Sequence, residues 1–416
     1  MYQKIIVFVL LATGVILLFV GCQNEDIEQK EVDNKEMELD ETMLTLLTTV
    51  KPYGEVVHAV AIALENEVDA TVLSTDSFKV VVETEEGRKE RTITDIYTNN
   101  QANTINQPLP GEFLIIELDP DDNDAGTLVY NEEEDYNVRK ELTYYLEQLE
   151  DVETELGQRI VSNKENLLIT KEYQQLVTDF KYDVFNSDAG QNLDYYLFEP
   201  EIEDNDSYPL ILFLHGNGER GNGNGINLLG NEGAIVWARP EQQALNPAYV
   251  LAPQAPLDGE EFFIWGDEPR NSSVKELVDA TIEAYPIDRD RVYVVGISMG
   301  AIGTWRLLEN YPGFFAAAVA IAGTTNYEEI GEDNIAPVDK THLDAYFDVP
   351  IWAFHAEDDF VVTPDNIREL NELATEAGIE HFHYTEYKAE TIMPMGHFSW
   401  VPALQDEEML QWLFEQ

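Results

Sequence analysis

Beyond about residue 180 the chain alternates short apolar runs with helical patterns, and this alternation limits the possible folds more than any other feature. Strands covered on both faces read as compact apolar runs, and such runs occur at residues 210–214, 249–252, 292–295, 316–321 and 350–354. Helical periodicity occupies residues 274–284, 301–310 and 366–377, the last ended by Gly378. The alternation predicts an α/β domain over residues 181–416, with a mostly parallel sheet and helices on both faces.

The first half of the chain carries a different pattern, in which apolar and polar residues alternate as in a half-buried strand. Residues 56–64 show this alternation, and shorter strand-like runs follow at residues 78–82, 92–97 and 113–118. Short strands separated by turn residues predict a small all-β sandwich over residues 43–173. Within it, residues 136–156 fit a helix as well as strands.

The N-terminus combines Lys4, an apolar run at residues 5–20 and the only cysteine of the chain, Cys22. The run is shorter than the roughly 20 residues of a membrane-spanning helix, so residues 1–22 are predicted to be a signal segment. The ending Phe19-Val20-Gly21-Cys22 resembles a bacterial lipobox, which implies that Cys22 is lipidated and becomes the mature N-terminus. An uncleaved anchor is the alternative, and both interpretations place the rest of the chain outside the cytoplasm.

The charge balance is strongly acidic, because 24 Lys and Arg residues face 81 Asp and Glu residues for a net charge of −57. Binding to nucleic acid depends on cationic side chains that neutralise phosphates, so nucleic acid is excluded as a partner. The same field disfavours anionic substrates and anionic lipid surfaces, which leaves the lipid anchor as the only expected membrane contact. Residues 23–42 are rich in acids and are predicted to be a solvated tether. We expect a saline or alkaline habitat for such a chain.

The strongest chemical signal is Gly296-Ile297-Ser298-Met299-Gly300, which lies between a predicted strand and a predicted helix. A sharp strand-to-helix turn needs glycines on both sides and leaves the serine hydroxyl exposed above the sheet. The amino end of the following helix adds N–H donors and a positive dipole for an oxyanion. Ser298 is therefore the predicted nucleophile.

A serine nucleophile needs a base and a carboxylate, which follow it along the chain in this kind of fold. His397 lies in a loop after the last predicted strand, where an imidazole can reach the serine. The strand at residues 351–354 ends in three adjacent carboxylates, of which Asp359 is the predicted acid and Asp358 the alternative. A structural role is predicted for His355, within the end of that strand. Packing or loop positions are also expected for the other downstream histidines, His342, His381 and His383.

The oxyanion needs a second backbone donor besides the N–H of Met299. The glycine-rich segment at residues 214–221 follows an early strand and allows the backbone to approach a substrate. Asn217 is the predicted donor, with Gly216 and Gly218 as alternatives, and His215 is expected to brace the loop.

The cluster Asp119, Asp121, Asn123 and Asp124 invites a metal interpretation. A calcium-binding EF-hand loop, however, needs Gly at its sixth position and Glu at its twelfth, where this chain has Asp124 and Tyr130. The cluster is therefore interpreted as a turn, and neither a metal nor an organic cofactor is expected.

Taken together, these motifs resemble the α/β-hydrolase superfamily. More narrowly, they resemble the bacterial "predicted peptidase" family, which is related to dienelactone hydrolases and polyhydroxybutyrate depolymerases and includes esterases with an N-terminal immunoglobulin-like domain. The segments that carry this resemblance are residues 215–221, 252–254, 288–293, 296–305 and 397–400. The resemblance implies Ser298 as nucleophile, Asp359 as acid and His397 as base, with Asn217 and Met299 as oxyanion donors. Ala301, Ala356 and Phe398 depart from the family pattern at positions that shape the pocket.

The function expected from these residues is that of an extracytoplasmic serine carboxylesterase acting on neutral small-molecule or glycan-linked esters. Esters have the better leaving group, but the catalytic residues alone do not distinguish an ester from an amide. A surface peptidase of the same fold is one alternative. A cell-surface binding lipoprotein with a vestigial hydrolase is the other.

Overall fold

The apolar runs of the second half form one eight-stranded sheet in the order β15-β16-β18-β17-β19-β20-β21-β22. The computed structural model describes residues 36–68, 73–105, 108–153, 159–162, 164–174, 176–202, 207–257, 265–326 and 337–416. From β18 onward neighbouring strands are parallel, whereas β15, β16 and β18 pair antiparallel. The strands are β15 (Lys181–Phe185), β16 (Leu193–Phe198), β17 (Tyr208–Leu214), β18 (Tyr249–Gln254), β19 (Ile287–Ile297), β20 (Ala317–Ile321), β21 (Ile351–Ala356) and β22 (Phe382–Tyr387).

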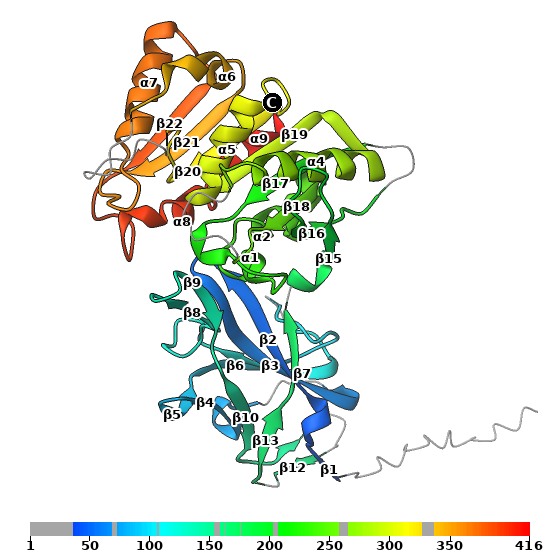
Figure 1. Ribbon diagram of the computed structural model, residues 1–416. Coiled ribbons are helices and arrows are strands. Elements are labelled where there is room, and N and C mark those ends of the chain that lie inside the picture. Colours follow the sequence, from blue (N-terminus) through cyan, green and yellow to red (C-terminus); the bar gives the residue numbers. More distant parts are fainter. Residues whose placement is uncertain are drawn as a thin grey trace, which may run out of the picture.

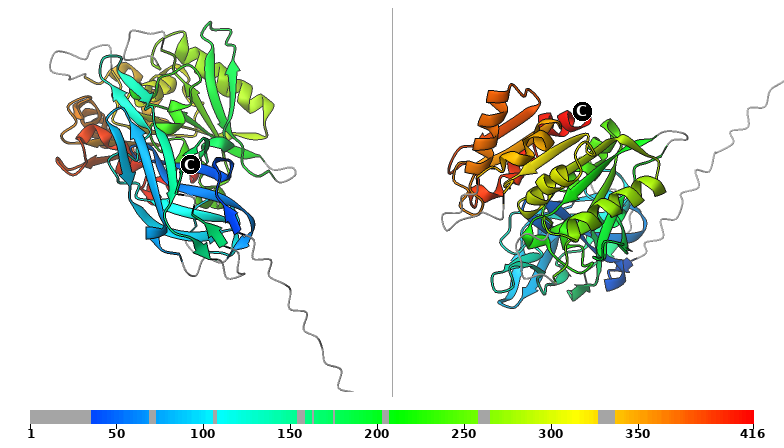
Figure 2. Two further views of the ribbon diagram at one scale, coloured as in Figure 1. Left: turned by 90° about the horizontal axis from the view of Figure 1, so that it is seen from below. Right: turned by 45° about the horizontal axis from the view of Figure 1, so that its top comes forward.

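Helices cover both faces of this sheet, because the side chains of each strand alternate between two apolar clusters. In β17, Leu210, Leu212 and Leu214 join the cluster that contains residues of α4, α5, α6 and α7. Ile211 and Phe213 point the other way, into the cluster with residues of α1, α2 and α9. Figure 2 shows α4 and α5 lying across the sheet in its right-hand view. The helices are α1 (Ile226–Leu229), α2 (Ile235–Ala238), α3 (Pro240–Leu245), α4 (Arg270–Ala284), α5 (Met299–Asn310), α6 (Leu343–Phe347), α7 (Asp365–Ala377), α8 (Trp400–Ala403) and α9 (Glu407–Phe414).

The first half forms a β-sandwich whose two main sheets have the orders β14-β2-β3-β7-β6 and β13-β10-β4-β5. Inward-facing apolar residues of both sheets make one core cluster, and Val60, Val80 and Leu146 within it are fully buried. A small sheet, β1-β12-β11, and the hairpin β8-β9 complete this domain. Its strands are β1 (Glu36–Glu38), β2 (Leu44–Lys51), β3 (Gly54–Val68), β4 (Phe78–Thr84), β5 (Gly87–Arg91), β6 (Ile93–Asn99), β7 (Gly111–Leu118), β8 (Leu128–Asn131), β9 (Tyr136–Arg139), β10 (Thr143–Gln148), β11 (Val152–Glu153), β12 (Arg159–Val161), β13 (Asn166–Ile169) and β14 (Lys171–Gln174).

The two domains are stacked end to end, and the hairpin β8-β9 lies at the boundary between them (Figure 1). Six short 3₁₀ helices lie among the described residues. They are η1 (Glu41–Met43), η2 (Thr75–Ser77), η3 (Val177–Asp179), η4 (Asn217–Glu219), η5 (Lys340–His342) and η6 (Gly396–Phe398). Two of them, η4 and η6, belong to the site described below.

The structure differs from one expectation for the first half of the chain and decides between two others. The tether predicted for residues 23–42 does not extend that far, because β1 pairs with β12 and Leu39 is buried in the sandwich core. The part of it that lies before Glu36 falls outside the described residues. The segment 136–156, which fitted a helix or strands, forms strands where the structure describes it, because β10 pairs with both β4 and β13.

The acidic segment around Asp119 forms a turn. The Asp119 carboxylate accepts a hydrogen bond of 2.9 Å from the backbone N–H of Asp121. The Asp122 carboxylate pairs with the buried Arg91 at 3.0 Å. Among the described residues, no group of three His, Cys, Asp or Glu side chains is arranged to hold a metal ion.

Candidate active site

Ser298 lies at the strand-to-helix turn between β19 and α5, in a backbone conformation that non-glycine residues rarely adopt. Its φ is 51° and its ψ is −118°. The turn is so tight that a Cβ on Gly296 would lie 2.2 Å from the carbonyl oxygen of Gly300, and a Cβ on Gly300 would lie 1.9 Å from that of Leu214. Both glycines are therefore required, and the strain is held at the serine, as is common at functional sites.

Three side chains from separate loops meet at this turn. The Ser298 Oγ lies 2.9 Å from Nε2 of His397, which is part of η6. The Nδ1 of the same imidazole lies 2.8 Å from Oδ2 of Asp359, which follows the end of β21. The geometry is that of a serine whose hydroxyl donates to an imidazole, with the imidazole in turn donating to a carboxylate.

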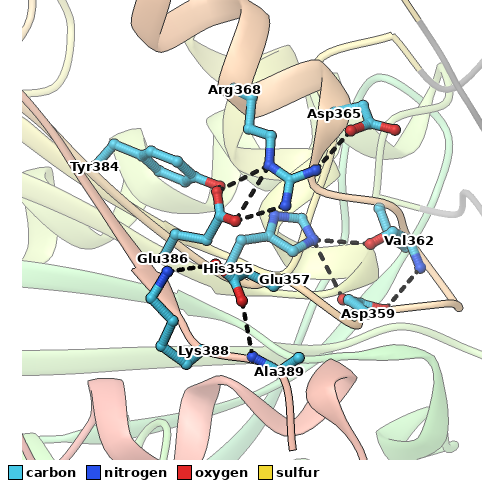
Figure 3. A network of polar contacts seen from close by, with 10 residues as sticks. All are labelled: His355, Glu357, Asp359, Val362, Asp365, Arg368, Tyr384, Glu386, Lys388 and Ala389. Carbon is cyan, nitrogen blue, oxygen red and sulfur yellow. Dashed lines mark hydrogen bonds and ion pairs between the residues drawn. The ribbon is translucent and has the colours of Figure 1, made fainter.

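The Asp359 carboxylate is surrounded by donors. Its Oδ1 accepts hydrogen bonds from the backbone N–H groups of Val361 at 2.9 Å and Val362 at 3.0 Å. Its Oδ2 lies 3.2 Å from Nε2 of the fully buried His355 (Figure 3). Burial is the largest influence on the pKa of Asp359 and raises it, but the hydrogen bonds and charges of His355 and His397 outweigh burial and hold this pKa well below its ordinary value. Asp359 is therefore ionised throughout the pH range of ordinary enzyme assays.

The adjacent carboxylate Asp358, the alternative acid, is engaged elsewhere. Its Oδ2 accepts a hydrogen bond of 2.8 Å from the backbone N–H of Glu390. The structure thus brings Asp359, and not Asp358, to His397.

Met299 and the segment that contains Asn217, which hold the two predicted oxyanion donors, both adjoin Ser298. Met299 is the first residue of α5, and the first N–H groups of a helix have no partner within the helix. A Cβ on Gly216 would lie 3.6 Å from the Ser298 Cβ, so the segment leading into η4 runs directly past Ser298. Asn217 is the first residue of η4 and directs its side chain away, toward the β-sandwich.

His215 braces this loop, as the sequence indicates. Its Nε2 accepts a hydrogen bond of 2.9 Å from the backbone N–H of Ala255. Its own carbonyl accepts one of 3.0 Å from Nε1 of the buried Trp265. Burial lowers the pKa of His215 to about 3, so this imidazole stays neutral.

The β-sandwich contacts the same loop through the hairpin β8-β9, a contribution that the sequence did not indicate. The side-chain amide of Asn217 donates to the Asp135 carboxylate at 2.7 Å and to the Asp135 carbonyl at 3.1 Å. Arg220 donates to the same carbonyl at 2.9 Å, and the Asn137 amide donates to the Gly218 carbonyl at 3.0 Å. Asp135 has a φ of 61°, so the tip of the hairpin turns sharply here.

A cavity of about 560 Å³ opens over Ser298 and His397, and both domains line it. The sandwich supplies Tyr53 and Tyr130, and the catalytic domain supplies Phe398 and Trp400. Tyr53 also fastens the boundary, because its hydroxyl donates to the Met393 carbonyl at 2.8 Å.

Glu219 lies in the wall of this cavity as a buried carboxyl. Among the described residues no Lys, Arg or His forms an ion pair with it. Burial raises its pKa to about 7, against the opposing effect of hydrogen bonds that include the backbone N–H of Gly216. A titratable group is therefore built into the loop beside Ser298.

The remaining site prediction, lipidation at Cys22, concerns a residue outside the described part of the chain. Within the described residues, no helix is both long and apolar enough to cross a membrane.

Comparisons with known proteins agree with this architecture. Residues 43–161 match the family described as the esterase Ig-like N-terminal domain. The chain is similar to the crystal structure of a thermostable esterase, with 34% sequence identity and a TM-score of 0.81. The match covers 90% of this chain and 99% of that one. The chain belongs to this family of α/β-hydrolase esterases with an immunoglobulin-like N-terminal domain. The fold class, the family and the assignment as a hydrolase enzyme are thereby confirmed.

Two further relatives match this chain over shorter stretches. The poly(3-hydroxyalkanoate) depolymerase C of Paucimonas lemoignei is 33% identical over 125 residues, which are 28% of either chain. The acetylxylan esterase A of Emericella nidulans is 45% identical over 53 residues, 13% of this chain and 17% of that protein. The chain thus spans less than a third of the length of these two relatives in the matched regions.

Proposed function

We propose that this protein is a serine carboxylesterase that hydrolyses neutral esters through an acyl-enzyme on Ser298. The observation that carries the proposal is the continuous hydrogen-bonded series from Ser298 through His397 to Asp359, at 2.9 and 2.8 Å, on the floor of an open cavity. An exposed serine alcohol is inert at neutral pH, and this arrangement is what makes it a nucleophile.

In the proposed reaction the Ser298 Oγ attacks the ester carbonyl carbon while its proton passes to Nε2 of His397. The anionic Asp359 stabilises the imidazolium that forms and holds its Nδ1–H in place. The oxyanion of the tetrahedral intermediate receives hydrogen bonds from the backbone N–H of Met299 and from the loop at Asn217 or Gly216. Collapse breaks the ester C–O bond, and the alcohol leaves with the proton from His397. Water then attacks the acyl-enzyme by the same steps and releases the acid.

Neutral substrates are favoured on two grounds. The chain carries a net charge of −57, and the carboxylate of Asp135 lines the cavity. Aromatic rings at the cavity, including Tyr53, Tyr130 and Trp400, offer apolar surfaces for an acyl group or for the faces of sugar rings. A small-molecule or glycan-linked ester fits these surfaces, and a match to an acetylxylan esterase supports this class of substrate.

We further propose that the enzyme works outside the cytoplasm, attached to the membrane by a lipid on Cys22. The lipobox-like ending of the first apolar run supports this placement. Replacing Cys22 with Ala should release the enzyme from the membrane fraction, and continued membrane attachment would remove the lipid anchor from the proposal.

The test of the activity compares the wild type with Ser298→Ala on a panel of neutral esters that includes acetylated and feruloylated sugars, each with its matched amide. We expect hydrolysis of esters over amides, loss of at least about 10³-fold of the rate in Ser298→Ala, and labelling of the wild type alone by a fluorophosphonate. Faster hydrolysis of the amides would make the protein a peptidase. Retention of most of the ester rate in Ser298→Ala would refute the serine mechanism, and a wild type that takes no label would be a vestigial hydrolase.

A further inference from the structure

A second imidazole contacts the proposed catalytic acid. His355, in β21, is fully buried, and its Nε2 lies 3.2 Å from Oδ2 of Asp359. This is the same oxygen that lies 2.8 Å from Nδ1 of His397. Two histidines thus share one carboxylate oxygen, and only one of them contacts the serine.

The surroundings of His355 determine which ring nitrogen carries a hydrogen. Its Nε2 lies 2.8 Å from the carbonyl oxygen of Val362, which can only accept a hydrogen bond. The Nε2 must therefore carry a hydrogen, which it donates to the Val362 carbonyl, and Oδ2 of Asp359, at 3.2 Å from the same nitrogen, is close enough to be a second, longer acceptor. The buried Nδ1 of His355 has no hydrogen-bond partner in the described part of the chain. Figure 3 shows the ring with Nε2 facing Val362 and Asp359.

We propose that His355 is a positioning residue for ester hydrolysis, which orients the Asp359 carboxylate so that Oδ2 receives the Nδ1–H of His397. This inference rests on the proposed function. The backbone N–H groups of Val361 and Val362 both donate to Oδ1 of Asp359 and not to Oδ2. A carboxylate that is held at only one oxygen can still turn about its Cβ–Cγ bond. The donor on Oδ2 removes that freedom. It also takes part of the negative charge of Oδ2, which limits how strongly Asp359 retains the proton on His397.

The other charged groups around His355 are paired among themselves. Glu386 of β22 lies opposite His355 in the strand register and receives three hydrogen bonds from Arg368 of α7, at 2.6, 2.9 and 3.2 Å. Tyr384 donates to the same carboxylate at 2.7 Å. The neighbouring Glu357 accepts a hydrogen bond of 3.1 Å from the backbone N–H of Ala389 and pairs with Lys388. These pairs leave Asp359 as the carboxylate that accepts from His355 (Figure 3).

The test uses two polar variants that differ in reach. In His355→Gln the side-chain amide can take the place of the Nε2 donor, whereas in His355→Asn the shorter amide stops near the position of Nδ1. We expect His355→Asn to lower kcat roughly tenfold with little change in KM, as for a lost hydrogen bond to a charged group. The acid limb of its pH profile should move to higher pH by roughly half a unit, because Oδ2 of Asp359 then lacks the His355 donor and retains the proton on His397 more strongly. His355→Gln should recover kcat to within about threefold of the wild type and restore the pH profile.

The matched control is His381→Asn. His381 also donates from Nε2 to a backbone carbonyl, that of Phe347 at 2.7 Å, but lies at the opposite end of β22 from the active site. This variant should change the melting temperature without moving the pH profile. An unmoved pH profile in His355→Asn, or equal losses of kcat in the Gln and Asn variants, would overturn the positioning role.

A measurement without turnover separates this inference from the proposed function. In protein labelled with ¹⁵N-histidine, the Nδ1–H resonance of His397 should shift in His355→Asn and return in His355→Gln. An inactive wild type that shows this pattern refutes the esterase proposal and leaves only the orientation of Asp359 toward His397 by His355. An active wild type whose resonance is the same in both variants refutes the positioning role alone. Should His355→Asn fail to fold, full activity of the folded His355→Gln beside a strongly impaired His355→Leu would sustain the role, and equal impairment of both would refute it.

Discussion

The carboxylate of Asp135, at the tip of a hairpin in the immunoglobulin-like domain, accepts a 2.7 Å hydrogen bond from the side chain of Asn217 in the catalytic domain. The bond joins the two domains within the loop that passes the nucleophile. The Asn217 side chain is thereby held on the sandwich side of the loop, while its backbone carbonyl accepts a hydrogen bond of 3.0 Å from Nε of Arg220.

Removing this carboxylate should slow catalysis more than it destabilises the protein. Asp135→Gly preserves the left-handed backbone conformation and the main-chain carbonyl contacts, so only the side-chain bonds are lost. We expect kcat/KM for a soluble aryl ester to fall about three- to tenfold. Glu134→Gly, at the exposed neighbouring position, is the matched control and should retain its activity. Full kcat/KM in Asp135→Gly would show that the hairpin does not position the loop.

The choice between the two adjacent acids can be made with isosteric amides. Asp359→Asn keeps the size of the side chain but loses the charge that stabilises an imidazolium at His397, and kcat should fall roughly 10³- to 10⁴-fold. Asp358→Asn should stay within a few-fold of the wild type, because Asp358 accepts from the backbone of Glu390 instead. The reverse order of the two effects would exchange their roles.

Gly300, two residues after Ser298, is required by sterics. A Cβ at position 300 would lie 1.9 Å from the backbone carbonyl oxygen of Leu214, and neither β17 nor α5 can move without disturbing the sheet. Gly300→Ala should therefore reduce the free energy of unfolding by about 3 kcal/mol or more. Ala301→Gly, one residue further along α5, should cost only about 1–2 kcal/mol, from helix propensity and the loss of a buried methyl group. Urea titrations of both variants measure the difference, and equal costs would contradict the steric explanation.

The buried Glu219 predicts a dependence of stability on pH. Because its pKa is raised to about 7 in the folded protein, the folded state holds a proton there that the unfolded chain releases near pH 4.5. Its stabilising contribution is complete below pH 4.5 and is lost as the pH rises to about 7. Glu219→Gln should thus gain stability relative to the wild type between pH 5 and pH 9, on the order of 3 kcal/mol. Denaturant titrations at both pH values, with Glu133→Gln as a surface control, test this; a pH-independent difference would show that Glu219 is not buried as a carboxyl.

The acidic composition predicts that salt stabilises the fold. With a net charge of −57, repulsion between the carboxylates weakens the compact state. Salt screens this repulsion, because the Debye screening length falls from about 10 Å at 0.1 M salt to about 3 Å at 1 M. The melting temperature should rise over this range, and by equal amounts in NaCl and KCl. A melting temperature indifferent to salt would argue against the saline or alkaline habitat that the composition indicates.

Much of the catalytic domain could be predicted because its buried strands and amphipathic helices each leave a local signal. The run that forms β17 is wholly apolar, and Ser298 stands between two glycines that only a tight turn requires. Strands with exposed or charged faces left no such signal. The edge strand β5, with the sequence Gly-Arg-Lys-Glu-Arg, is an example, because its pairing with β4 is a tertiary contact.

In the site too, residues marked by the local sequence could be predicted, whereas residues brought in by tertiary contacts could not. Ser298, His397 and Asp359 could be selected from chain order and from their places at the ends of strands. Asp135 could not, because it lies 82 residues from Asn217 in a polar hairpin of another domain, and nothing local marks it. The sequence predicts a structural role for His355, since a histidine inside an apolar run usually packs, and only the fold brings its Nε2 to within 3.2 Å of Asp359.

The cavity over the nucleophile has walls from two domains that fold around separate cores. Residues of the sandwich that contact a substrate can therefore change while Ser298, His397 and Asp359 stay the same. Such a division lets new substrate preferences arise by altering a few surface turns, with the reactive groups inherited intact.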